Sequence, residues 1–185
     1  MKKPSFLLLL VPLVLALPQG AQTPDRPHWS FSVALGAGGH PDRAGDVYYE
    51  TSTSNTGLLA IAYRFGSGAL RPLLRSELLS EGPGSDWLDC PPAPNGSCLA
   101  DFPAPDGVGG AAGLTYQLTS GLDASLLAGV GRYDDTRRGF VEAGAAILIT
   151  TRIAATVAAR HMAWDQPGVG RHWYRPVFLG LQANW

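Results

Sequence analysis

The chain has 185 residues, of which 45% are hydrophobic and 16% charged, and its formal net charge is −1. This balance gives no electrostatic reason to expect nucleic acid as a partner. The length suits a single domain. The chain contains 23 glycines, and its charged residues are sparse for a soluble protein.

The first 21 residues are interpreted as a signal peptide. Lys2 and Lys3 precede an apolar run over residues 6–17, which suits a signal-peptide core and is too short to span a bilayer as a helix. Ala21 is the expected cleavage position, and Ala16 is the alternative. Residues 22–185 then form the mature domain. Because no other apolar run approaches helix-spanning length, any membrane insertion must use strands.

Eight runs of the mature chain alternate apolar and polar residues with a period of two. Each has the length, about 10–12 residues, that a tilted membrane strand needs. None shows convincing helical periodicity. The runs cover residues 29–39, 56–65, 71–80, 108–118, 122–132, 139–149, 152–163 and 174–185.

The connections between these runs alternate in length. Short connections are expected at residues 66–70, 119–121 and 150–151. Longer ones are expected at residues 40–55, 81–107, 133–138 and 164–173. This order places every short turn at one end of a barrel, which is typical of outer-membrane barrels with short periplasmic turns and longer outer loops.

The two faces of the runs differ in polarity. Leu35, Leu126 and Leu179 belong to a largely aliphatic face, which we expect to point outward. A lipid-facing arginine near the bilayer midplane would cost about 2–4 kcal/mol, so the charged residues of the runs should point inward and pair. This predicted interior network consists of Arg64, Arg75, Glu77, Asp123, Glu142, Arg152 and Arg160.

Aromatic residues gather near both ends of the runs, as the two interfaces of a membrane select. The predicted periplasmic girdle is Trp29, Phe31, Tyr63, Phe65, Tyr116 and Trp185. The predicted outer girdle is Tyr48, Tyr49, Trp87, Tyr133, Phe140, Trp164, Trp173 and Tyr174.

The segment 81–107 is the best candidate for contact with the outside. Its two cysteines, Cys90 and Cys98, are expected to form a disulfide in an exported chain, since no histidine or third cysteine nearby completes a metal site. The segment is acidic and has no Lys or Arg. Candidate contact residues are Trp87, Asp89, Asp101 and Phe102. The simpler interpretation is a solvated loop that is polar because it is exposed.

The last residues, 174–185, carry the most specific signal. Leu179, Leu181, Ala183 and Trp185 share one face of a strand that ends on an aromatic residue. The chain therefore resembles the small eight-stranded outer-membrane β-barrels, the group of OmpA-type membrane domains and OmpX-like proteins. That group's assembly signal has a terminal aromatic residue and a glycine five positions earlier, matched here by Trp185 and Gly180. Ala183 and Phe178 depart from its other preferences.

The resemblance implies an all-β fold, a closed antiparallel eight-stranded up-and-down transmembrane barrel in the bacterial outer membrane. It also implies outer-membrane lipids and the barrel assembly machinery as partners, and we expect a monomer. Eight strands leave an interior just filled by side chains, which argues against a general diffusion pore, although the sequence leaves a narrow conductance open.

No catalytic, cofactor-binding or metal-ligating residue is predicted, because the four histidines show no HExxH spacing and no GxSxG elbow is present. We expect a non-enzymatic protein with a structural or surface-interaction role. One alternative is a membrane-embedded lipid-modifying enzyme, but its expected His-x-Ser pair occurs only at His28 and Ser30, at the periplasmic start of the first strand. The other is a soluble secreted barrel that binds a small apolar ligand, which would need an apolar interior.

Overall fold

The structure, a computed structural model, describes residues 27–39, 43–44, 47–48, 53–81, 106–133, 135–166 and 170–185. The predicted signal peptide lies outside these residues. So do the predicted disulfide of Cys90 and Cys98 and the candidate contact residues Trp87, Asp89, Asp101 and Phe102.

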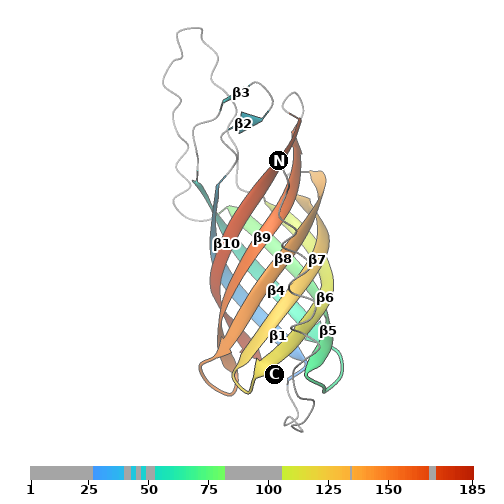
Figure 1. Ribbon diagram of the computed structural model, residues 1–185. Coiled ribbons are helices and arrows are strands. Elements are labelled where there is room, and N and C mark those ends of the chain that lie inside the picture. The colour runs from blue at the N-terminus through green and yellow to red at the C-terminus, as the bar shows by residue number, and fades with distance from the viewer. Residues whose placement is uncertain are drawn as a thin grey trace, which may run out of the picture.

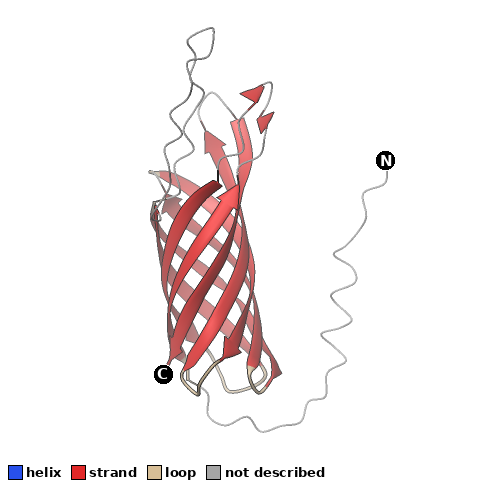
Figure 2. Ribbon diagram, turned by 90° about the vertical axis from the view of Figure 1, so that its left-hand side faces the viewer, coloured by secondary structure: helices blue, strands red, loops and turns tan. Residues whose placement is uncertain are grey.

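Alternating sequence produces a barrel of long strands (Figures 1 and 2). Eight strands close into one ring in the order β1-β10-β9-β8-β7-β6-β5-β4, and all neighbours are antiparallel. A separate two-stranded ribbon, β2-β3, lies beyond one end of the ring. The strands are β1 (Trp29–Gly39), β2 (Arg43–Ala44), β3 (Val47–Tyr48), β4 (Thr53–Arg64), β5 (Leu70–Glu81), β6 (Gly107–Thr119), β7 (Leu122–Tyr133), β8 (Thr136–Leu148), β9 (Ile153–Gln166) and β10 (Gly170–Asn184).

The first and last strands of the ring close it. Ser30 of β1 faces Asn184 of β10, and at the very end Trp29 and Trp185 exchange two backbone hydrogen bonds of 3.0 and 3.1 Å. Closure pairs the backbone N–H and C=O groups that an open edge would leave exposed. Such unpaired groups are very costly in hydrocarbon. The predicted closed antiparallel eight-stranded barrel is confirmed.

The two ends of the barrel are built differently. At the end that we call the turn end, strands are joined by residues 65–69, 120–121 and 149–152, close to the predicted short turns. We call the opposite end, where β4 begins and β5 ends, the loop end.

Two of the predicted longer connections are wrong. β7 and β8 extend through residues 133–138 and leave only residues 134–135 between them, with Asp135 in the left-handed region at φ 59°. β9 and β10 similarly take up most of residues 164–173. The strands stay paired beyond the apolar belt of the barrel. There a strand no longer needs an apolar face, so the alternation that identifies it in the sequence fades.

The outward face is apolar. Leu35, Leu126 and Leu179 are 60%, 64% and 65% exposed, and large hydrophobic side chains surround the barrel on every strand of the ring. Monomeric soluble proteins rarely expose so much continuous apolar surface, whereas lipid chains solvate it. The interior holds paired charges, as described below, whereas the alternative of a soluble barrel that binds a small apolar ligand would need an apolar interior. No helix in the described part of the chain is long and apolar enough to cross a membrane.

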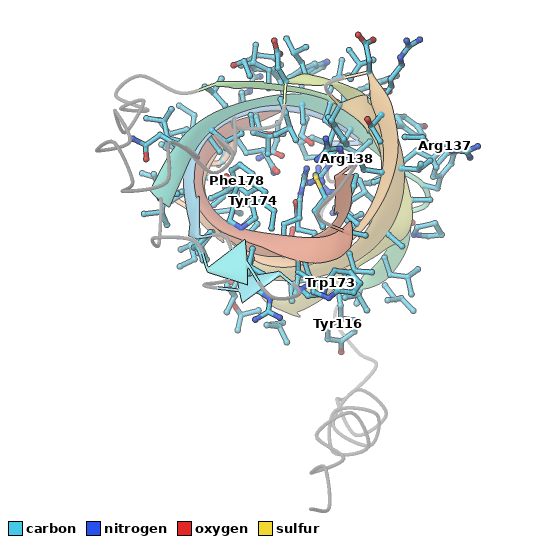
Figure 3. The ribbon with its side chains drawn as sticks, turned by 90° about the horizontal axis from the view of Figure 1, so that it is seen from above. Tyr116, Arg137, Arg138, Trp173, Tyr174 and Phe178 are labelled. Atoms are coloured by element: carbon cyan, nitrogen blue, oxygen red, sulfur yellow. The ribbon has the colours of Figure 1, made fainter. Side chains whose placement is uncertain are left out.

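The turn end carries an aromatic girdle. Tyr63 makes edge-to-face contacts with Trp29 and Phe65, each with ring centroids 4.8 Å apart, and Trp185 is 55% exposed. Tyr116 also points outward (Figure 3). Bulky amphipathic rings of this kind occupy membrane interfaces.

Part of the predicted outer girdle is wrong. Tyr133, Phe140 and Tyr174 point into the barrel and are at most 4% exposed. Their position in the alternation explains this, because each is in phase with an inward polar residue of its own strand. Trp173, one residue from Tyr174, points outward and is 39% exposed (Figure 3).

Candidate functional site

The centre of the barrel holds a group of paired charges. Arg160 of β9 lies between two carboxylates, Glu77 of β5 and Glu142 of β8. Its Nη1 and Nη2 donate to the two oxygens of Glu77 at 2.7 and 2.8 Å. Its Nε and Nη2 donate to Glu142 Oε2 at 2.9 and 2.7 Å. Both contacts use the planar fork of the guanidinium, the strong geometry for arginine–carboxylate pairs.

Arg75 and Tyr133 complete this group. Arg75 Nη1 donates to Glu142 Oε1 at 2.6 Å, and its Nη2 lies 2.9 Å from Glu77 Oε2. The Tyr133 hydroxyl donates to Glu77 Oε1 at 2.6 Å. We call these five residues, from four strands, the interior cluster. Its two arginines and two glutamates compensate each other, as buried charges require.

Aromatic rings enclose the interior cluster. The Arg160 guanidinium carbon lies 4.0 Å from the Phe140 ring centroid and 5.2 Å from that of Phe178, within the range of cation–π attraction. The side chains of Arg160 and Glu77 are wholly inaccessible to solvent. Both carboxylate oxygens of Glu77 are therefore engaged by arginine inside the barrel.

Inward glycines make room for the inward rings. A Cβ added at Gly36 would lie 2.5 Å from the Phe178 ring, and one at Gly38 would lie 2.6 Å from the Tyr174 ring. Such distances are far below van der Waals contact. Each of these glycines therefore accommodates a ring from the last strand.

The same arrangement occurs on the other side of the barrel. A Cβ at Gly129 would lie 2.4 Å from the Phe140 ring, and one at Gly131 would lie 2.4 Å from the Tyr133 ring. Tyr174 is held further by a 2.7 Å hydrogen bond between its hydroxyl and that of Thr56. The rings, together with fully buried Leu79 and Met162, pack the loop half of the barrel as a core (Figure 3).

The other predicted network residues lie nearer the turn end. Asp123 is 4.0 Å from Arg71, and Arg64 is buried, 6% exposed. Arg152 does not belong in the interior, so this part of the prediction is corrected. It is exposed within the turn 149–152, because the alternation was extended one residue too far beyond the strand.

Two inward arginines were missed by the sequence analysis. Arg71 is 4% exposed and Arg138 is 5% exposed. Their position in the alternation could have revealed them. Arg71 lies on the same face of β5 as Arg75, and Arg138 lies on the same face of β8 as Glu142.

A cavity of about 80 Å³ lies on the turn-end side of the interior cluster. Arg75, Glu142 and Phe178 form part of its lining. Small apolar side chains line much of the remainder, together with these polar side chains: Ser30, Ser32, Thr115, Ser125, Thr156 and Gln182. The volume suffices for several water molecules, with polar partners to hold them.

Two histidines, His28 and His161, make contacts of an ordinary kind. His28 Nδ1 donates to the Arg64 carbonyl at 2.8 Å at the turn end. His161 stacks on Trp173 near the loop end, with ring centroids 4.2 Å apart. Among the described residues, no group of three His, Cys, Asp or Glu could hold a metal ion.

The two residues of the predicted assembly signal lie on the last strand. Trp185 is exposed on the outward face. A Cβ at Gly180 would lie 2.3 Å from the Val33 carbonyl oxygen and 2.6 Å from the Ala34 Cβ. The close approach of β1 therefore explains why position 180 requires a glycine, in addition to its predicted part in the assembly signal.

No protein-family model matches the chain, and neither does any curated protein sequence. Solved structures do match. Ail, the attachment invasion locus protein of Yersinia pestis, has a TM-score of 0.52 at 10% identity, over 86% of this chain and 99% of that one. Neisserial surface protein A has a TM-score of 0.48 at 10% identity, over 85% and 97%. OprG from Pseudomonas aeruginosa has a TM-score of 0.43 at 9% identity, over 89% and 99%.

At such identities the likeness to Ail shows the fold alone. The chain has the fold of the small eight-stranded outer-membrane barrels, and the resemblance expected from its sequence is confirmed at that level.

Proposed function

We propose that the protein is a non-enzymatic barrel of the bacterial outer membrane, with a structural or surface-interaction role carried by its loop end. The observation that carries this proposal is the packed loop half of the interior. Rings and paired charges fill it, so the barrel offers stability and an outer surface in place of a wide passage.

Two further features support the outer membrane and the orientation. The outward apolar face matches a lipid environment. Short turns gather at one end, where outer-membrane barrels face the periplasm. The turn end is then periplasmic and the loop end faces outward.

The proposal includes the predicted partners. Outer-membrane lipids surround the barrel, and the assembly machinery recognises Gly180 and Trp185. The acidic segment 81–107 supplies the surface contact through Trp87, Asp89, Asp101 and Phe102, held by a Cys90–Cys98 disulfide. The barrel acts as a monomer.

Heat-modifiability of the protein extracted from outer-membrane fractions tests the proposal. We expect the unboiled protein to migrate faster on an SDS gel than the boiled protein, because the closed barrel resists the detergent. Liposomes containing the protein should not swell in sugar solutions, whereas liposomes with a sixteen-stranded porin should. Recovery in the soluble fraction would contradict the location, and swelling would contradict the packed interior.

A further inference from the structure

The outward face ends differently on the two sides of the barrel. On four neighbouring strands, β7 to β10, the outward face carries a basic side chain toward the loop end. Val130 is followed by Arg132, Val177 by Arg175, and Ala159 by His161 as each strand is followed toward the loop end. On β8 the corresponding residue is Arg137. We call these residues the basic rim: Arg132, Arg137, His161 and Arg175.

The other four strands of the ring have no such residue. Their outward positions at the same end are Ala37 on β1, Asn55 on β4, Ser80 on β5 and Asp106 just before β6. Among the described strands of the ring, the outward positive charge at this end is therefore confined to β7, β8, β9 and β10. A general preference for arginine at membrane interfaces would distribute it around the whole circumference.

Within the basic rim, like charges face one another. Arg132 and Arg137 are directly opposite in the β7–β8 register and point to the same outward face. Directly opposed like charges destabilise a strand pair. Arg132 forms an ion pair with Asp135 at 2.9 Å, but the two side chains are 71% and 93% exposed, so this pair is weak. An anion bound between the two arginines would relieve the repulsion.

Arg175 and His161 form the second part of the basic rim. Tyr174 pairs with Met162 and Val177 with Ala159, which places Arg175 beside His161 on neighbouring strands. The His161 ring stacks on Trp173, whose indole points outward from the barrel (Figure 3), and tryptophan favours the membrane interface. No described residue forms an ion pair with Arg137 or Arg175.

We infer that the basic rim binds the phosphate groups of an outer-leaflet lipid headgroup, with the acyl chains along the apolar surface of β7 to β10 below it. This inference rests on the proposed function, since it places the loop end at the outer leaflet. Guanidinium groups bind phosphate bidentately. The apolar strands directly adjoining the arginines favour a lipid over a free anion.

The test uses protein extracted from membranes in detergent micelles and native mass spectrometry. The probes are lipid A with two phosphates, the same lipid after enzymatic removal of the phosphates, and inorganic phosphate alone. We expect the phosphorylated lipid to bind most tightly. Arg137→Gln should weaken its binding about five-fold and the triple variant R132Q/R137Q/R175Q about a hundredfold, at roughly five-fold for each arginine.

Arg152→Gln is the matched control, because Arg152 is an exposed arginine at the opposite end of the barrel. It should leave lipid binding unchanged. Heat-modifiability checks that each variant is folded, and the single variant decides the matter if the triple variant does not fold.

Equal binding of phosphorylated and dephosphorylated lipid would overturn the inference, as would equal losses for Arg137→Gln and Arg152→Gln. Inorganic phosphate that binds as tightly as the lipid would overturn the lipid assignment. A folded barrel that fails these binding tests but fractionates with the outer membrane would contradict only this inference. One found outside the outer membrane would contradict the proposed function.

Discussion

The two halves of the barrel interior solve the same problem in opposite ways. The loop half contains the largest side chains, among them Tyr133, Tyr174 and Phe178, and buries the paired charges of the interior cluster. The turn half encloses a cavity of about 80 Å³, lined mostly by small side chains, both apolar and polar. The interior of this eight-stranded barrel is therefore packed as a core over part of its length and hollow over another part.

The difference shows where stability should reside. A buried charge depends on each of its partners, because removing one leaves the others desolvated and uncompensated. Replacing a small hydroxyl in the lining of a cavity should change the free energy of unfolding little. Substitutions in the loop half should therefore be costly, and those in the turn half should be tolerated.

The largest effect is expected for Arg160→Met, which leaves Glu77 and Glu142 with one arginine between them. We expect it to lower the free energy of unfolding by about 3–5 kcal/mol. Urea titration in detergent micelles, with the folded fraction read from unboiled gels, measures the loss. Arg152→Met, in the exposed turn, is the control and should change stability by less than about 0.5 kcal/mol. Equal effects of the two variants would show that the interior cluster is not important for stability.

A smaller effect is expected for Gly36→Ala, since the new Cβ would lie 2.5 Å from the Phe178 ring. Overpacking of this kind costs about 1–3 kcal/mol. The same titration measures it. In Gly139→Ala, the control, the new Cβ would lie 3.8 Å from the Gly129 carbonyl oxygen, an ordinary contact, so the free energy of unfolding should be unchanged or slightly higher. A combined Gly36→Ala and Phe178→Leu variant should lose less than the sum of the single losses; additive losses would argue against the contact.

The smallest effect is expected for Ser32→Val, which replaces a hydroxyl in the lining of the turn-half cavity. We expect the free energy of unfolding to change by less than about 0.5 kcal/mol, because the cavity has space for the added methyl group. The same titration measures it. A loss as large as that of Gly36→Ala would show that the turn half is packed like the loop half.

The sequence predicts the barrel well because alternation directly reports a lipid-facing and a lumen-facing side. It predicts that Arg75, Glu77, Glu142 and Arg160 point inward. It does not predict which of them meet, because Arg75 and Glu142 lie on strands that are not neighbours in the ring.

The loop end was predicted less well for a different reason. Outside the apolar belt both faces of a strand can be polar, so the residues that join β7 and β8 resemble a loop in sequence. Phase remains informative there, and it would have assigned Tyr133 and Phe140 to the interior. Their position near the strand ends indicated a girdle instead.

The ring-and-glycine contacts between β10 and β1 have a consequence for how the barrel closes. Sliding one strand past its neighbour by a single residue would exchange the inner and outer faces, which alternation forbids. A slip of two residues keeps every polarity correct, so alternation cannot prevent it. Here such a slip in one direction would bring the Phe178 ring from Gly36 onto the Cβ of Ala34. The match between the Phe178 ring and Gly36 therefore opposes that slip by steric exclusion at the seam, which the alternation of polar and apolar residues alone cannot do.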